Sequence, residues 1–136
     1  KELLDIAARD PQVTVTGYVP DVRPFVWDAT VYVVPLRVGG GTRLKVLDAM
    51  AMGKAMVSTS IGCEGLDVKP DVHLLVADEP EAFADKTIQL LRDAECRTRL
   101  GRNARELVEQ CYSWKKIGRQ LVEAYRQAID GRRRRS

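Results

Sequence analysis

The feature that most constrains the fold is an apolar run that leads through a glycine-rich loop into a helix pattern. Residues 30–35 read Thr-Val-Tyr-Val-Val-Pro, a near-continuously apolar run typical of a strand that is buried on both faces. Three consecutive glycines follow at residues 39–41, and a helix pattern then runs from Thr42 to about Met52. Gly53 stands where a left-handed residue ends many helices. A strand, a tight loop and a helix in this order indicate a parallel sheet with helices on its faces.

Further strands and a short helix are predicted in the first part of the chain. Short β-rich runs predict strands at residues 13–16, 55–59 and 73–77. Asp21 lies where it can cap a short helix that carries Phe25, Val26 and Trp27.

The last third of the chain is predicted to be helical. Asp78 and Pro80 open one helix, and Ser113 caps the last one. Between them, apolar residues recur at three- and four-residue spacing from Cys96 to Cys111. The predicted fold is therefore α/β, with a Rossmann-like, doubly wound parallel sheet and a helical C-terminal third.

The chain is predicted to form one domain, residues 1–130, followed by a basic tail, residues 131–136. Residues 132–135 are four arginines, and without them 18 basic residues stand against 19 acidic ones. The folded part is therefore not expected to bind nucleic acid. The tail is expected to be disordered and solvated, and the alternative is contact with an anionic membrane surface.

Cysteine and histidine usage argues against a metal site. Cys63, Cys96 and Cys111 are scattered without a CxxC pair, and His73 is the only histidine. No run approaches the roughly 18 apolar residues that a membrane span needs. Because free thiols fit a reducing compartment, we expect a cytoplasmic protein. The basic tail also allows a cytoplasmic protein that is bound at the inner face of a membrane.

Two loops are the candidate binding segments, because ligands of such sheets bind beyond the carboxyl ends of the strands. These loops are residues 17–21 and 36–42. In the second, glycines let the backbone approach a ligand, and the following helix start offers unpaired N–H groups to an anion. Arg37, Arg43 and Lys45 add cations nearby. A tight turn with solvated arginines explains this loop equally well.

The helix after the glycines carries one carboxylate, Asp48. At about 100° per residue, the buried face of this helix is predicted to consist of Leu44, Leu47, Met50 and Ala51. Asp48 lies on the flank of that face, where it could accept hydrogen bonds from a diol such as a ribose. The alternative, which the residues alone slightly favour, is a surface pair with Lys45 one turn away.

The motif at residues 39–53, together with its surroundings, points to a known family. It reads Gly-Gly-Gly-Thr-Arg-Leu-Lys-Val-Leu-Asp-Ala-Met-Ala-Met-Gly. With its flanks it resembles the core motif of glycosyltransferase family 4, also called group 1. Four other segments resemble family signatures in the right order, and the resemblance covers residues 12 to 128. These segments are residues 17–21, 28–35, 61–66 and 112–114.

The resemblance implies the carboxyl-terminal, donor-binding domain of the two-domain GT-B fold. Such enzymes transfer a sugar, here expected to be of hexose type, from a nucleotide diphosphate sugar to an acceptor with retention of configuration. It implies a UDP- or GDP-type donor, with no cofactor and no essential metal. The amino-terminal domain supplies most of the acceptor site and is missing from this sequence, so the chain alone is expected to be inactive.

The family's pattern of two acids, with seven residues between them, assigns roles to individual residues. Its second acid, which holds the ribose hydroxyls, falls on Asp48, and its first, which touches the transferred sugar, falls on Gly40. This chain therefore lacks the first acid, and no catalytic residue is assigned. The base is expected against loop residues Tyr18, Val19 and Asp21. The implied donor site consists of Gly39, Gly40, Gly41, Thr42, Arg43, Lys45 and Asp48.

The resemblance also implies that the first strand of the domain is absent from the sequence. In a sheet of order 3-2-1-4-5, residues 13–16, 30–35, 55–59 and 73–77 would be strands two, three, four and five. The central position would then be empty, and open strand edges recruit other strands. We expect self-association to fill the gap, and the alternatives are direct pairing of strands two and four, or an upstream strand.

Three other functions remain open at this point. A nucleotide-sugar epimerase of the same fold would need a histidine and acids for proton abstraction, whereas His73 starts a predicted strand and is expected to be structural. A phospho-acceptor signalling module would need an aspartate at the end of its central strand, where this chain has Val34 and Pro35. An interaction scaffold would bind no nucleotide.

Overall fold

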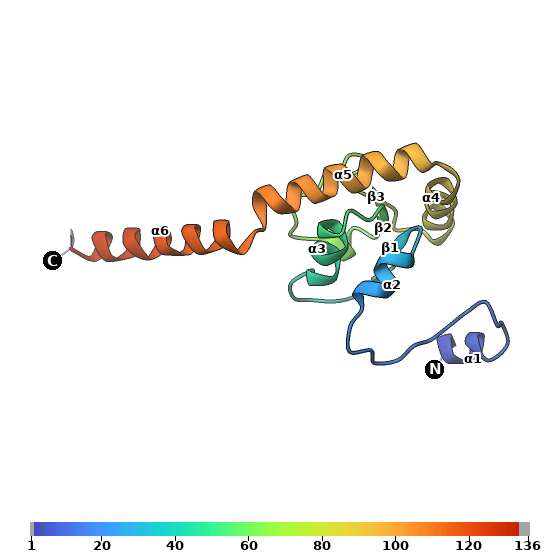
Figure 1. The fold of residues 1–136 in the computed structure, drawn as a ribbon. Coiled ribbons are helices and arrows are strands. Elements are labelled where there is room, and N and C mark those ends of the chain that lie inside the picture. The colour runs from blue at the N-terminus through green and yellow to red at the C-terminus, as the bar shows by residue number, and fades with distance from the viewer. Residues whose placement is uncertain (1, 134–136) are drawn as a thin grey trace.

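A computed structural model describes residues 2–133 and shows a parallel sheet between layers of helices (Figure 1). Strand and helix alternate through the centre of the chain, and helices alone make up its last part. The elements are α1 (Glu2–Ala7), α2 (Arg23–Asp28), β1 (Tyr32–Val34), α3 (Leu44–Ala51), β2 (Met56–Ser58), the 3-10 turn η1 (Ile61–Cys63), β3 (Leu75–Val76), α4 (Pro80–Arg92), α5 (Ala94–Cys111) and α6 (Trp114–Arg133).

The sheet has three parallel strands in the order β1-β2-β3. Tyr32 pairs with Met56 at the start of the β1–β2 ladder, and Val57 pairs with Leu75 in the β2–β3 ladder. All of β2 is buried, as expected for a central strand in a sheet that is covered on both faces.

The core lies on both faces of this sheet. Successive residues of β2 point to opposite faces, so that Met56 joins one apolar cluster and Val57 the other. Helix α3 covers the first face and α4 the second, and α5 contributes to both through Ala104 and Leu100. The predicted α/β fold with a doubly wound parallel sheet and a helical C-terminal third is confirmed.

The strand predicted at residues 13–16 does not form, and this prediction was wrong. The segment is irregular, Thr14 to Thr16 are exposed, and Val13 N donates only to Asp10 O in the preceding turn. A strand exists only where a second strand accepts its hydrogen bonds, and no part of residues 2–133 pairs with this segment. Figure 1 shows it as an extended link between α1 and α2, away from the sheet.

The predicted order of the strands was also wrong. Residues 30–35 and 55–59 were placed as strands three and four with two positions between them, but β1 and β2 are direct neighbours in register. The three strands occupy consecutive positions because each crossover returns the chain to the adjacent position of the sheet. The expected central gap is therefore absent from the described part, where β1 and β3 are the two edge strands.

The buried face of α3 differs from the predicted one. Leu47 and Met50 do face inward, but Leu44 and Ala51 are exposed, and Val46 and Ala49 are buried instead. Helix α3 packs against α5 as well as the sheet, since Ala104 of α5 belongs to the same cluster as these α3 residues. The apolar stripe is thus rotated toward α5. Gly53 ends the helix with φ +69°, as predicted.

Helix α6 extends away from the sheet in Figure 1. Trp114, Leu121, Tyr125 and Ile129 along it are more than half exposed. The helix continues to Arg133, so the first three residues of the predicted disordered tail are helical, and Arg134 to Ser136 lie outside the described residues. Among residues 2–133, no helix is both long and apolar enough to cross a membrane.

Candidate functional site

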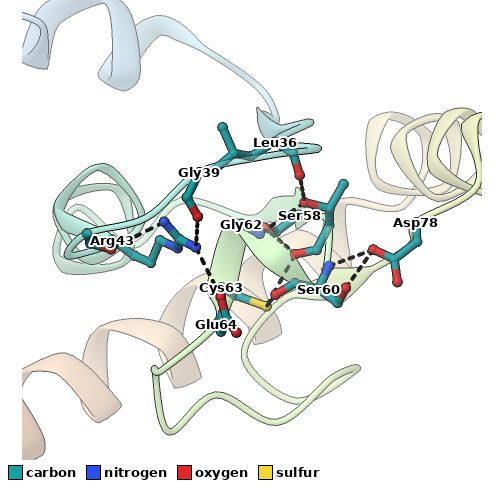
Figure 2. Close-up of polar contacts among 11 residues, drawn as sticks. Leu36, Gly39, Arg43, Ser58, Ser60, Gly62, Cys63, Glu64 and Asp78 are labelled. Carbon is teal, nitrogen blue, oxygen red and sulfur yellow. Dashed lines mark hydrogen bonds and ion pairs between the residues drawn. The ribbon is translucent and has the colours of Figure 1, made fainter.

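Side-chain hydrogen bonds tie together the loops at the carboxyl ends of the three strands (Figure 2). Thr59, just after β2, donates through Oγ1 to Leu36 O at 2.6 Å and accepts from Gly62 N at 3.0 Å. Asp78, just after β3, accepts from both the backbone N and the Oγ of Ser60, at 2.8 and 2.9 Å. The start of the glycine-rich loop is therefore anchored to the turn that follows β2.

The glycine-rich loop itself is open on its outer side. Gly39, Gly40 and Gly41 are exposed, and a Cβ at Gly40 or Gly41 would meet no atom within 4 Å. Gly41 has φ +89°, a conformation that glycine adopts readily and L side chains rarely do. The backbone of this loop is therefore exposed at its outer side.

The side chain of Arg43 is buried and is not a solvated cation. Its side chain is only 7% exposed and lies under the loop. The guanidinium donates to Gly39 O and Gly41 O, each at 3.2 Å, and approaches a carboxylate oxygen of Glu64 at 3.3 Å. Figure 2 shows Gly39 and Glu64 beside the guanidinium. Arg43 therefore binds the protein's own loop.

The main cavity lies between α2, β1 and α3 and measures about 630 Å³. Asp48 and Lys45 line it from α3, and Asp21 lines it from the loop before α2. The structure thus brings part of the predicted donor site and part of the predicted base-binding loop to one cavity. Its full lining is Pro20, Asp21, Val22, Arg23, Val26, Tyr32, Lys45, Asp48, Ala49, Ala51 and Met52.

Electrostatics in this cavity centre on two carboxylates. Arg23 donates to Asp21 at 2.8 Å, and these hydrogen bonds lower the pKa of Asp21. Burial raises the pKa of Tyr32, and the negative charge of Asp48 raises it further. Asp48 and Tyr32 thus line the same cavity, while Asp21 is already held by Arg23.

Several predicted site residues lie outside this cavity. Tyr18 is 92% exposed and lines none of the cavities described here. Val19 lines a neighbouring cavity of about 300 Å³ that shares Tyr32 with the first. Gly39 to Gly41 and Thr42 line neither. Lys45 and Tyr32 also line a separate cavity of about 290 Å³ that follows β1 to Leu36.

The sequence did not indicate Tyr32, Thr59, Glu64 and Asp78 as part of the site. In the sequence, Tyr32 has the pattern of a strand residue, and Glu64 stands in a segment that resembles a family signature. Glu64 and Arg43 are 21 residues apart, so no local spacing joins them. The rule that carboxyl ends of parallel strands share one edge would have placed Thr59 and Asp78 beside the loop.

His73 lies in the turn before β3, at the edge of the sheet opposite these loops. Its Nδ1 accepts a hydrogen bond from Lys69 N at 2.9 Å, which requires a ring nitrogen without a proton. Burial first, and then the charge of Lys69, lower the pKa of His73. His73 is thus a structural acceptor and is far from the main cavity in the fold.

We expect NMR titration of this sole histidine to give a pKa below its ordinary value of about 6.5. The contribution of His73 to stability is full above the unfolded-state pKa, where the ring is neutral in both states. It is lost as pH falls, because the unfolded chain takes up the proton first. The urea-unfolded chain is the control, and a folded pKa at or above the unfolded one would contradict the acceptor role.

Residues 2–133 contain no group of three or more His, Cys, Asp or Glu side chains arranged to hold a metal ion. Cys63, Cys96 and Cys111 are free thiols, and the first two are buried. Burial is the main cause that raises the pKa of Cys63.

Comparison with protein families matches residues 1–93 to the family described as glycosyl transferases group 1. A D-inositol 3-phosphate glycosyltransferase of Corynebacterium urealyticum is 36% identical over 85 residues, 61% of this chain and 20% of that protein. An uncharacterized 44.6 kDa protein in the cps region of Klebsiella pneumoniae is 31% identical over 87 residues, 64% of this chain and 22% of that protein. The chain spans about a fifth of the length of these curated relatives.

Two solved structures resemble this fold. Sucrose-phosphate synthase from Thermosynechococcus elongatus superposes with a TM-score of 0.80 at 26% identity, over 96% of this chain and 33% of its own. The C-terminal domain of a group 1 family glycosyl transferase from Francisella tularensis gives a TM-score of 0.71, over 83% of this chain and 60% of its own. At 22% identity, this second likeness shows the fold alone.

Proposed function

This chain belongs to the group 1 glycosyl transferases, and we propose that it is the donor-binding half of a retaining, hexosyl-transferring enzyme. The donor in this proposal is a nucleotide diphosphate sugar, of UDP or GDP type. The observation that carries it is the meeting of Asp21 with Lys45 and Asp48 in one cavity of about 630 Å³, a size within the usual range for small-molecule sites. Asp21 ends the candidate loop at residues 17–21, whereas Lys45 and Asp48 lie on α3, the helix that follows the candidate loop at residues 36–42.

The proposed donor runs from this cavity toward the glycine-rich loop. We assign the base to the side of residues 17–21 and the ribose hydroxyls to the carboxylate of Asp48. The diphosphate then lies along Lys45, with the exposed backbone of Gly40 and Gly41 beside it. Cations and N–H groups aimed at the leaving diphosphate stabilise the charge that develops as the sugar leaves. We propose that they do so without a metal.

An acceptor-binding half is the partner that we propose for this chain. The match with sucrose-phosphate synthase covers 96% of this chain but only 33% of that protein. The exposed apolar residues of α6 are the surface that we propose for this contact, because an apolar stripe of this kind usually packs against another element.

Two alternative partners would bind other parts of the molecule. They are a second copy at the free edge of β1 and the inner face of an anionic membrane at arginines 132–135, in a cytoplasmic protein. Sedimentation of the whole enzyme, alone and with anionic vesicles, distinguishes these partners from an acceptor-binding half.

The proposed function is tested by calorimetric titration of the whole enzyme with UDP, GDP, ADP and their sugars. We expect one nucleoside diphosphate to bind and its sugar to be transferred. The 136-residue chain alone should bind it more weakly and transfer nothing, because transfer needs donor and acceptor held together in one cleft. Interconversion of the donor without an acceptor would favour an epimerase, and absence of nucleotide binding would favour a scaffold.

Two glycines in the loop provide a matched pair of variants. Gly40→Ala adds a methyl group in open space, so unfolding stability should change by less than about 0.5 kcal/mol while donor affinity falls. Gly41→Val should weaken donor binding too, but its positive φ adds strain of about 1–3 kcal/mol to the folded state. Denaturant unfolding and calorimetry separate the two effects. Unchanged donor affinity in Gly40→Ala would remove this backbone from the site.

A further inference from the structure

Arg43 combines burial, charge and incomplete pairing in a way that a structural arginine does not require. Its side chain is 7% exposed, and its Nε has no hydrogen-bond partner among the described residues. Its carboxylate partner, Glu64, is 74% exposed at the side chain, so water screens that ion pair. A buried positive charge thus remains only partly neutralised directly beneath the glycine-rich loop.

The two carbonyls that Arg43 binds determine the direction of two N–H groups. In a trans peptide the C=O and the following N–H point to opposite sides of one plane. Because Gly39 O and Gly41 O point inward to the guanidinium, the N–H groups of Gly40 and Thr42 point away from it. Within residues 2–133, neither of these N–H groups donates to a backbone carbonyl.

We propose that Arg43 is a positioning residue that holds the glycine-rich loop in its anion-binding form. Its planar fork fixes the carbonyls of Gly39 and Gly41 from beneath, so that the N–H groups of Gly40 and Thr42 face the diphosphate of the donor. Its buried charge adds a positive field on the same side. Thr59 holds the start of the loop through Leu36 O, and Arg43 holds the middle. This inference rests on the proposed function.

Lysine cannot replace this arginine, because an ammonium group has no rigid fork to span two carbonyls. In Arg43→Lys the charge is kept and the geometry is lost. Arg105→Lys is the matched control, since Arg105 is exposed on α5 and pairs with Glu109 one turn along the same helix.

The test uses the whole enzyme and compares two probes, the nucleoside diphosphate that binds best and its nucleoside. In Arg43→Lys, we expect the Kd of the diphosphate to rise at least about tenfold and that of the nucleoside to change less than about twofold. Arg105→Lys should change both by less than about twofold. Equal loss of both probes in Arg43→Lys would show a structural role only, and an unchanged diphosphate Kd would overturn the proposal.

A second measurement separates this proposal from the proposed function. Backbone ¹⁵N relaxation should show residues 39–42 ordered in the native protein and mobile in Arg43→Met, with no ligand present. If the native enzyme binds no nucleotide, the proposed function fails. The positioning role of Arg43 is contradicted if residues 39–42 are as ordered in Arg43→Met as in the native protein.

Discussion

Replacing Gly101 by alanine is expected to destabilise the fold by about 3 kcal/mol or more, at the upper end of overpacking effects. Gly101 is buried in α5, and a Cβ there would overlap the carbonyl oxygen of Gly53 and approach its carbon to 3.0 Å. Gly53 cannot swing away easily, because its φ of +69° closes the turn between α3 and β2. Denaturant unfolding of the 136-residue chain measures the effect.

Gly118 gives the control for this substitution. It lies in α6, where a Cβ would meet no atom within 4 Å, so Gly118→Ala changes only helix propensity. The control should be neutral or more stable by up to about 1 kcal/mol. The expected cost at Gly101 arises because α5 and the turn at Gly53 touch through their backbones. A Gly101→Ala variant as stable as the native chain would mean that α5 can slide across the α3–β2 turn.

The centre of the fold could be predicted because its signals are local. The apolar run at residues 30–35, the three glycines and Gly53 each carry their own conformational preference, and β1, α3 and the turn follow them. The strand at residues 13–16 failed because a strand depends on a partner that no local pattern specifies. The strand order failed for a related reason, since neighbours in a sheet are set by crossovers and not by position in a family pattern.

The candidate site was predictable to a similar extent. Asp21, Lys45 and Asp48 share a cavity, but the rule about carboxyl ends of strands does not explain this, because the segment with Asp21 follows no strand and the cavity reaches Tyr32 at the start of β1. The direction in which the Arg43 side chain points was not predictable from the sequence. An arginine beside glycines has the same sequence pattern whether it faces a ligand or the loop's own carbonyls. Its contact with Glu64 decides between the two, and that pair spans 21 residues.

Asp48→Asn is expected to weaken donor binding by about 1.5–3 kcal/mol, roughly ten- to a hundredfold, in the whole enzyme. Asparagine keeps the shape of the side chain but replaces a charged acceptor of two hydroxyl hydrogen bonds with a neutral amide. Calorimetry with the donor measures the loss. Asp85→Asn, at an exposed position of α4, is the control and should leave donor affinity unchanged.

The Asp48→Asn variant also tests the cavity without any ligand. The charge of Asp48 raises the pKa of Tyr32 in addition to burial, so Asp48→Asn should lower that pKa while Asp85→Asn should not. Ultraviolet titration of the tyrosines, with Tyr32→Phe to assign the signal, measures this shift. If the pKa of Tyr32 falls but donor affinity holds, Asp48 faces the cavity without touching the ribose. If neither changes, the carboxylate lies away from Tyr32 in solution, and the assignment of the ribose to this cavity is wrong.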